Sequence, residues 1–181
     1  MIDAIASKKY FIENLIWVNT IGDSFRRANV YKPEFKESEK GKEALKKILH
    51  NHLQQLVIDH YKNAVSEKQH LKNIASLQSE SVSNILNGGK LNYGVCQKML
   101  NVYLKYQWCN GVIPTPPHFP VDRIIQEKLK CKPVVSWTKD IVTEAQYLDV
   151  IRYAEEVMKE EPFSSLAEME LEIFQKSITL K

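Results

Sequence analysis

The spacing of apolar residues is the feature that most constrains the fold of this chain. Along most of the sequence these residues recur three and four positions apart, which is the spacing of one face of an α-helix. The pattern predicts long helices over residues 2–21 and 42–65, and no run alternates long enough for a sheet. A chain of 181 residues is the size of one domain. We therefore expect one all-α domain over residues 1–181, a bundle of about seven or eight helices. A division into lobes 1–87 and 88–181 is the alternative.

Capping signals predict where several helices begin and end. A hydroxyl residue followed three positions later by an amide or acid is the capping-box spacing, found here at Ser66–Gln69, Thr143–Gln146 and Ser165–Glu168. Asp122 suits the N-cap of a helix that runs through Leu129. We place the end of the first helix near Gly22, a short helix at residues 82–86, and an extended segment or short strand at residues 132–137. Four prolines within residues 112–120 exclude a helix there and make this segment a connector.

The charge balance excludes the two extreme classes of charged protein. The chain has 25 basic and 22 acidic residues, a net charge of +3, so it is neither a histone-like polycation nor an acidic disordered tail. The charge is unevenly distributed, because residues 1–150 sum to +6 and residues 151–181 to −3. This distribution is compatible with a modest basic face on the first part of the chain.

The cysteines and the hydropathy of the chain predict the cellular compartment of the protein. The three cysteines, Cys96, Cys109 and Cys131, form no C-x-x-C motif and are odd in number, so we expect reduced thiols, no metal site and no cofactor. No stretch approaches the roughly 18 apolar residues that span a bilayer. The N-terminus lacks the charge order of a signal peptide. We expect a cytoplasmic protein that does not insert into membranes.

The helix predicted at residues 93–109 differs from the others. It is apolar around most of its circumference, which is typical of a helix near the centre of a domain. A narrow polar row interrupts the apolar surface, made of Gln97, Lys98, Asn101 and Lys105, with Trp108 at its end. If the helix is central, this row must find partners or open into a cleft. The alternative is that the row is simply the exposed face of the helix.

Two stretches of this region resemble a known family. Residues 94–104 (GVCQKMLNVYL) are similar to a G-V-G-x-K-x-x-N-V-x-L stretch, and residues 120–125 (PVDRII) to a following P-x-V-D-x-[HN]-[VI] stretch. Both belong to the helix-hairpin-helix DNA glycosylases of the endonuclease III-like group. The resemblance covers residues 88–125. The chain departs from the family at Cys96, where the hairpin has its second glycine, and in a longer connector before Asp122.

The resemblance implies a DNA partner and a role for individual residues. Lys98 corresponds to the amine that attacks C1′ of the sugar, and Asp122 to the carboxylate that assists departure of a flipped base. Gly94 and Val95 correspond to the turn whose amides bind a phosphate. Further DNA contacts are expected from Lys105, Lys128 and Lys130.

Each of these residues also has a plainer interpretation. Lys98 is alternatively a surface lysine, and Asp122 only a helix cap. His118, within the proline-rich connector, is a loop histidine or, together with Asp122, the centre of a hydrolase. A non-enzymatic function through protein partners or self-association is the competing hypothesis, suggested by the apolar face of residues 42–65 and the acidic final helices.

Overall fold

The computed structural model describes residues 4–35 and 38–178. Within these ranges the protein is all-helical and has no strand, which confirms the expected fold class. Its seven α-helices are α1 (Ala4–Phe25), α2 (Glu39–Asp59), α3 (Glu67–Glu80), α4 (Tyr93–Cys109), α5 (Arg123–Lys128), α6 (Glu144–Met158) and α7 (Leu166–Ile178). None of the helices in the described ranges is long and apolar enough to cross a membrane.

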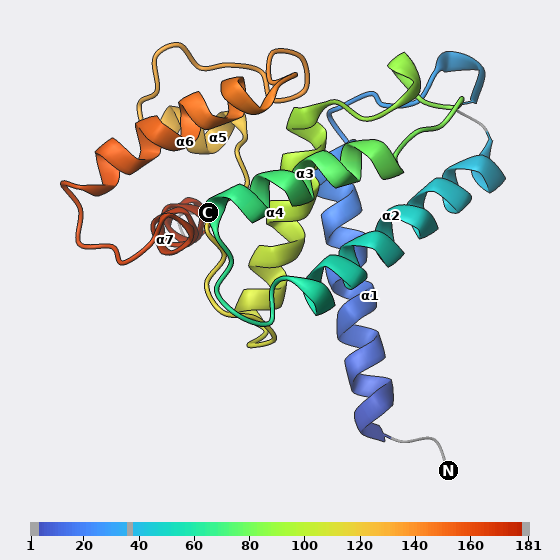
Figure 1. The fold of residues 1–181 in the computed structure, drawn as a ribbon, viewed down its shortest axis with the longest axis horizontal. Helices are drawn as coiled ribbons and strands as arrows, with labels where there is room; N and C mark the ends of the chain where they lie inside the picture. The colour runs from blue at the N-terminus through green and yellow to red at the C-terminus, as the bar shows by residue number, and fades with distance from the viewer. Residues whose placement is uncertain (1–3, 36–37, 179–181) are drawn as a thin grey trace.

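Helix α4 lies at the centre of the bundle. α1, α2 and α3 pack on one side of it, and α5, α6 and α7 lie on the other (Figure 1). Thirteen of the 17 residues of α4 are buried, as its nearly continuous apolar surface predicts. α4 therefore contacts helices from both parts of the chain, and the buried apolar side chains of the described residues form one cluster around it.

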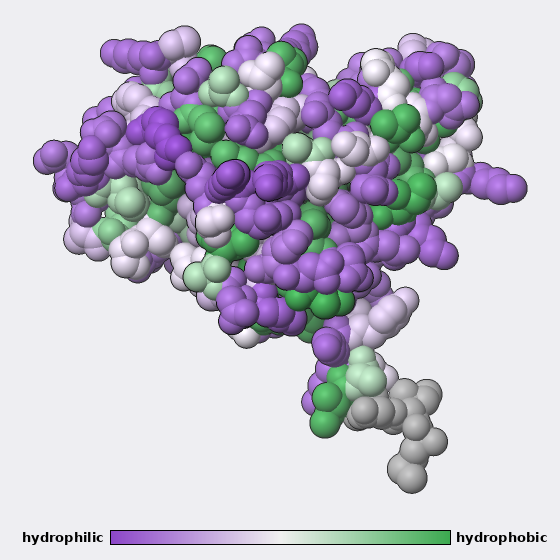
Figure 2. Space-filling view, viewed as in Figure 1, coloured by the Kyte–Doolittle hydropathy of each residue, from purple (hydrophilic) through white to green (hydrophobic). Residues whose placement is uncertain are grey.

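Helix α1 extends beyond the rest of the bundle. Its C-terminal half packs along α4, whereas its N-terminal half projects away from the other helices (Figure 1). The space-filling view shows apolar surface on this projecting part, next to a body that is mostly hydrophilic on the face shown (Figure 2).

The predicted caps are present. The Ser66 side chain accepts a hydrogen bond from the Gln69 amide at 3.3 Å, and the Ser165 side chain accepts one from the Glu168 amide at 3.1 Å. At the start of α6, the Thr143 and Gln146 side chains satisfy each other's backbone amides in a complete capping box. These contacts are local in sequence, which is why the residue pattern alone predicts them.

Two helix ends differ from the sequence-based prediction. α1 continues through Gly22 to Phe25, because the buried residues Thr20 and Ser24 keep this last turn packed against the core. A glycine inside a helix costs only about 1 kcal/mol, which packing readily offsets. α2 ends at Asp59, since residues 60–65 form the turn that brings α3 back against α2.

Two predicted elements are absent from the structure. Residues 82–86 are not a helix, because the Ile85 carbonyl accepts from the Lys32 amide and the neighbouring Tyr31 and Leu86 form a β-bridge. Residues 132–137 are not a strand. The Gln126 side chain bonds both the amide and the carbonyl of Val135, at 2.9 and 3.0 Å, and so takes the place of a partner strand.

Candidate functional site

Lys98 and Asp122 form a direct ion pair. Nζ of Lys98 donates a hydrogen bond to Oδ2 of Asp122 at 2.7 Å, although the residues lie 24 positions apart. Only 10% of the Lys98 side chain and 25% of the Asp122 side chain are exposed. A lysine that extends into solvent would keep its ammonium hydrated, whereas this one is held by a carboxylate. The interpretation of Lys98 as a surface lysine is therefore wrong.

Asp122 is held in place by its own helix. It is the N-cap of α5, and its Oδ1 accepts a hydrogen bond from the Ile125 amide at 3.0 Å, which leaves Oδ2 for Lys98. Burial alone would raise the pKa of Asp122, but the Lys98 ammonium and the amide hydrogen bonds outweigh burial and lower the pKa below its ordinary value. Asp122 thus caps its helix and also presents a carboxylate to Lys98.

The ion pair lines an open cleft between α1, α4, α5 and α7. The cleft consists of two adjoining cavities, of about 180 and 250 Å³, which share Lys98, Asp122, Asp23 and Phe174 in their walls. The smaller cavity reaches toward the C-terminal end of α1, and the larger one lies between α4 and α7. The polar row of α4 therefore does open into a cleft at Lys98.

Two arginines add positive charge to the cleft. Arg26 and Arg27 follow the last residue of α1, are exposed, and line the smaller cavity together with Lys98. The sequence alone does not single out these residues, because a pair of arginines in a polar connector is usually a solvated surface. Their adjacency in the sequence was the signal, but only the packing of α1 against α4 places them beside Lys98.

Lys105, a predicted DNA contact, is paired within the protein. Its Nζ lies 2.7 and 3.0 Å from the two carboxylate oxygens of Glu170 in α7, and 4.0 Å from the centre of the Phe174 ring. Burial raises the pKa of Glu170, and the Lys105 ammonium offsets part of that effect. Since its charge is balanced by Glu170, Lys105 holds α7 to α4, and its assignment as a phosphate contact is corrected.

The amides of Gly94 and Val95 are also used inside the protein. The Gly94 amide donates to the Ile141 carbonyl at 2.8 Å, and the Val95 amide donates to Oδ1 of Asn92 at 2.8 Å. Both residues are buried. The role of a phosphate-binding turn is therefore corrected, because both of its expected donors already have protein acceptors.

Lys128 and Lys130 remain available for a ligand. Both are exposed, one in the last turn of α5 and the other just beyond it. α5 starts at the cleft, and its six residues place Lys128 about 9 Å along the helix axis from the cap. These lysines could extend the positive charge of the cleft along the adjacent surface.

His118 belongs to a buried polar network on another side of α4. Its Nδ1 lies 3.0 Å from the Tyr147 hydroxyl and its Nε2 lies 3.1 Å from a Glu67 carboxylate oxygen. The Tyr147 hydroxyl also accepts a hydrogen bond from the Asn101 amide at 3.0 Å. Burial lowers the pKa of His118 despite the Glu67 carboxylate. Since both ring nitrogens have partners other than Asp122, the geometry gives no basis for a hydrolase centred on His118 and Asp122.

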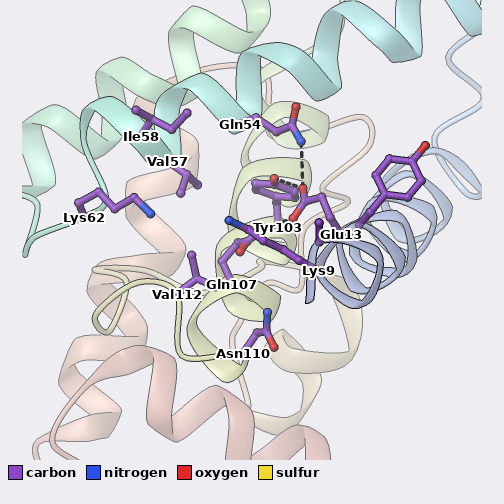
Figure 3. Close-up of a pocket in the computed structure, with 12 residues that line it drawn as sticks. Lys9, Glu13, Gln54, Val57, Ile58, Lys62, Tyr103, Gln107, Asn110 and Val112 are labelled. Carbon is purple, nitrogen blue, oxygen red and sulfur yellow. Dashed lines mark hydrogen bonds between the residues drawn. The ribbon is translucent and has the colours of Figure 1, made fainter. Parts of the chain in front are cut away.

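A wider groove, of about 500 Å³, lies between α1, α2 and α4 (Figure 3). Glu13 lines it and accepts hydrogen bonds from the Tyr103 hydroxyl and from Gln107 at 2.8 Å, and it lies 3.2 Å from Nε2 of His50. Burial would raise the pKa of Glu13, but these hydrogen bonds lower it to about 2. The sequence alone does not reveal this cluster, because its members come from three helices that are distant in the chain. The hydrogen-bonding capacity of the Glu13 carboxylate is used by protein donors, so Glu13 stabilises the packing of α1 against α2 and α4.

Metal-binding side chains are not clustered in the described part of the chain. Among residues 4–35 and 38–178, no group of three or more His, Cys, Asp or Glu side chains is placed to bind a metal ion. All three cysteines are free, Cys96 and Cys131 buried and Cys109 exposed.

Comparison with known proteins adds no identification. No protein-family model matches the chain, and no curated protein and no solved structure matches it either. The class of protein must therefore be argued from the cleft itself.

Proposed function

We propose that this protein binds DNA across the cleft and applies Lys98 and Asp122 to a nucleotide turned out of the duplex. The observation that carries the proposal is the 2.7 Å contact between Lys98 Nζ and Asp122 Oδ2 in an open cleft. The glycosylase resemblance assigns an amine and a carboxylate to the same two positions. Two residues 24 positions apart need not meet in a helical bundle, so their contact within one cleft supports a common role.

The chemistry that fits this pair is attack by an amine on C1′ of a sugar. At an abasic site, C1′ is an aldehyde carbon, and the deprotonated Lys98 amine adds to it and loses water to give an imine. Asp122 Oδ2 accepts the Lys98 hydrogen bond and so orients the nitrogen in the cleft, while the Lys98 proton is released to solvent. The negative charge of Asp122 also stabilises the positive charge that develops on the sugar.

Electrostatics supports DNA as the partner. Arg26 and Arg27 on one wall of the cleft, and Lys128 and Lys130 along α5, are exposed cations around the Lys98–Asp122 pair. Four phosphate contacts give modest affinity that falls steeply with salt. Reaching Lys98, which is largely buried, requires the nucleotide to leave the base stack.

Borohydride trapping on DNA with a single abasic site tests the proposal. We expect the wild-type protein to give a covalent adduct, and Lys98→Arg to give none, because arginine retains the charge opposite Asp122 but does not form the imine. Lys62→Arg, at the other groove, is the matched control and should retain the adduct. Failure to bind DNA at low salt would contradict the function. An adduct that persists in Lys98→Arg would contradict the assignment of Lys98.

A second candidate is a non-enzymatic protein that works through protein contacts. The apolar face of residues 42–65, which first suggested it, is unavailable because Leu45, Leu49 and Leu53 are buried in the core. A different surface favours this candidate, since the N-terminal half of α1 exposes several large apolar side chains. Retention of a protein partner by a variant that no longer binds DNA would support it.

A further inference from the structure

Helix α1 carries an apolar stripe that the rest of the described chain does not cover, which begins in the projecting N-terminal half and continues into the half that packs along α4. Phe11, Leu15 and Val18 are 61%, 45% and 63% exposed. The opposite side of the same helix supplies Ile16 and Thr20 to the core, both buried. Single exposed apolar residues are common, but three on one face of the same helix indicate a contact surface.

The spacing along the stripe is that of a two-helix seam. Lys8, Phe11, Leu15, Val18 and Gly22 follow one another at steps of three, four, three and four residues. This alternation is the heptad repeat of helices that pack as a coiled coil. The residues that α1 gives to its own core occupy other heptad positions, so the stripe is not needed for the fold.

We propose that α1 pairs with α1 of a second copy of this chain, in antiparallel orientation. In the register that places Leu15 beside Val18 of the other copy, Phe11 lies opposite Gly22. A Cβ built at Gly22 would be in ordinary van der Waals contact with the Arg26 guanidinium, at 3.6 Å, so what lies above Gly22 is the end of a flexible side chain. A large side chain opposite a small one fills the seam. A parallel pair would instead place Phe11 against Phe11 and Gly22 against Gly22, which crowds one layer and leaves the other empty.

Charge favours the same orientation. Lys8 and Lys9 lie toward the N-terminal end of α1, and Asp23 lies toward its C-terminal end, all three exposed. Antiparallel pairing places Lys9 of one copy near Asp23 of the other, with Arg26 and Arg27 close by, whereas parallel pairing places the lysines of both copies together and the arginines of both copies together. Antiparallel pairing therefore separates like charges better than parallel pairing does.

Dimerisation and the cleft are compatible. Gly22 lies at the α1 edge of the smaller cavity, so the second copy would narrow that side. No residue of the stripe lines the larger cavity between α4 and α7, through which Lys98 and Asp122 remain accessible. The stripe contains none of the residues assigned to DNA, although Asp23 and Arg26 beside it line the cleft. The dimer and DNA binding are measured separately, so either proposal can fail without the other.

Sedimentation equilibrium of the full chain, from low to high micromolar concentration, tests the dimer. We expect the wild type to associate, and Leu15→Lys to weaken the dimer by roughly a hundredfold, since two buried charges enter the seam. Val82→Lys, at a site 70% exposed outside α1, is the control and should dimerise as the wild type does. Unchanged helical circular dichroism and thermal unfolding would show that the variants fold. A wild type that stays monomeric, or a Leu15→Lys dimer of unchanged strength, would overturn the proposal.

Disulfide trapping tests the orientation, in a Cys109→Ser background that removes the exposed native thiol. A mixture of Lys9→Cys and Asp23→Cys chains should cross-link under mild oxidation, whereas each variant alone should not. Cross-linking of Lys9→Cys with itself would overturn the antiparallel arrangement. A monomer that co-sediments with phosphatidylcholine–phosphatidylglycerol vesicles would assign the stripe to a lipid surface and overturn the dimer.

Discussion

The backbone of Gly94, in the first turn of α4, packs directly against the carbonyl group of Trp137. A Cβ at position 94 would lie 1.8 Å from the Trp137 oxygen and 2.9 Å from the Ile141 oxygen, closer than atoms can approach. The Gly94 amide donates to that same Ile141 carbonyl. Since Trp137 lines the cleft, this contact helps to shape the wall beside Lys98 and Asp122.

Gly94→Ala is therefore expected to destabilise the protein strongly. The methyl group meets backbone atoms that cannot rotate away, so we expect a loss of about 3 kcal/mol in the free energy of unfolding, measured by urea denaturation. Gly111→Ala is the control. Nothing lies within 4 Å of its Cβ position, and only its positive φ of 71° opposes a side chain, a cost of about 1 kcal/mol. Equal losses in the two variants would contradict the close contact at Gly94.

The Lys98–Asp122 pair is expected to show energetic coupling. Lys98→Met leaves a largely buried carboxylate without its cation, at a cost of about 2 kcal/mol. Asp122→Asn removes the charge but retains the helix cap, because asparagine caps as well as aspartate does. The double variant should lose about 1–2 kcal/mol less than the sum of the single losses in a double-mutant cycle. Additive losses would show that the two side chains do not interact in solution.

Glu13 is expected to make the stability of the protein sensitive to acid. Its pKa is lowered from 4.5 to about 2, so its contribution is complete above pH 4.5 and is lost as the pH falls through about 2. Glu13→Gln should reduce the free energy of unfolding at pH 7 by about 2 kcal/mol and flatten its decline below pH 4.5. Glu43→Gln, at an exposed surface pair with Lys46, should change neither. A Glu13→Gln protein with the wild-type pH profile would contradict the assignment.

DNA binding, if it occurs as proposed, should respond separately to each exposed cation. Lys128→Ala and Lys130→Ala should each weaken binding to all sequences and reduce the slope of log affinity against log salt by about 1. Fluorescence anisotropy with a labelled duplex, repeated over a salt series, measures both effects. Lys62→Ala, at the groove between α1, α2 and α4, should leave the slope unchanged. An equal reduction of the slope in all three variants would show that binding depends only on the net charge of the protein and would contradict a contact at α5.

Features that depend on neighbours in sequence were predicted well. The caps at Ser66, Asp122 and Thr143, and the full extent of α4, follow from side chains and amides a few residues apart. The central position of α4 also follows, because a helix apolar on most sides is stable only when other helices surround it. The candidate pair Lys98 and Asp122 came from a local resemblance, but their contact did not.

Packing between residues that are distant in the sequence determined the remaining features of the fold and of the cleft. The sequence by itself determined that the chain is helical, where most of its helices lie, and which of them is central, because helix formation and capping are short-range interactions. Only the tertiary structure decided that Lys98 meets Asp122, that Glu170 neutralises Lys105, and that Gly94 packs against Trp137. Those contacts join residues on different helices or on the loops between them, and their geometry depends on how the whole set of apolar faces packs around α4.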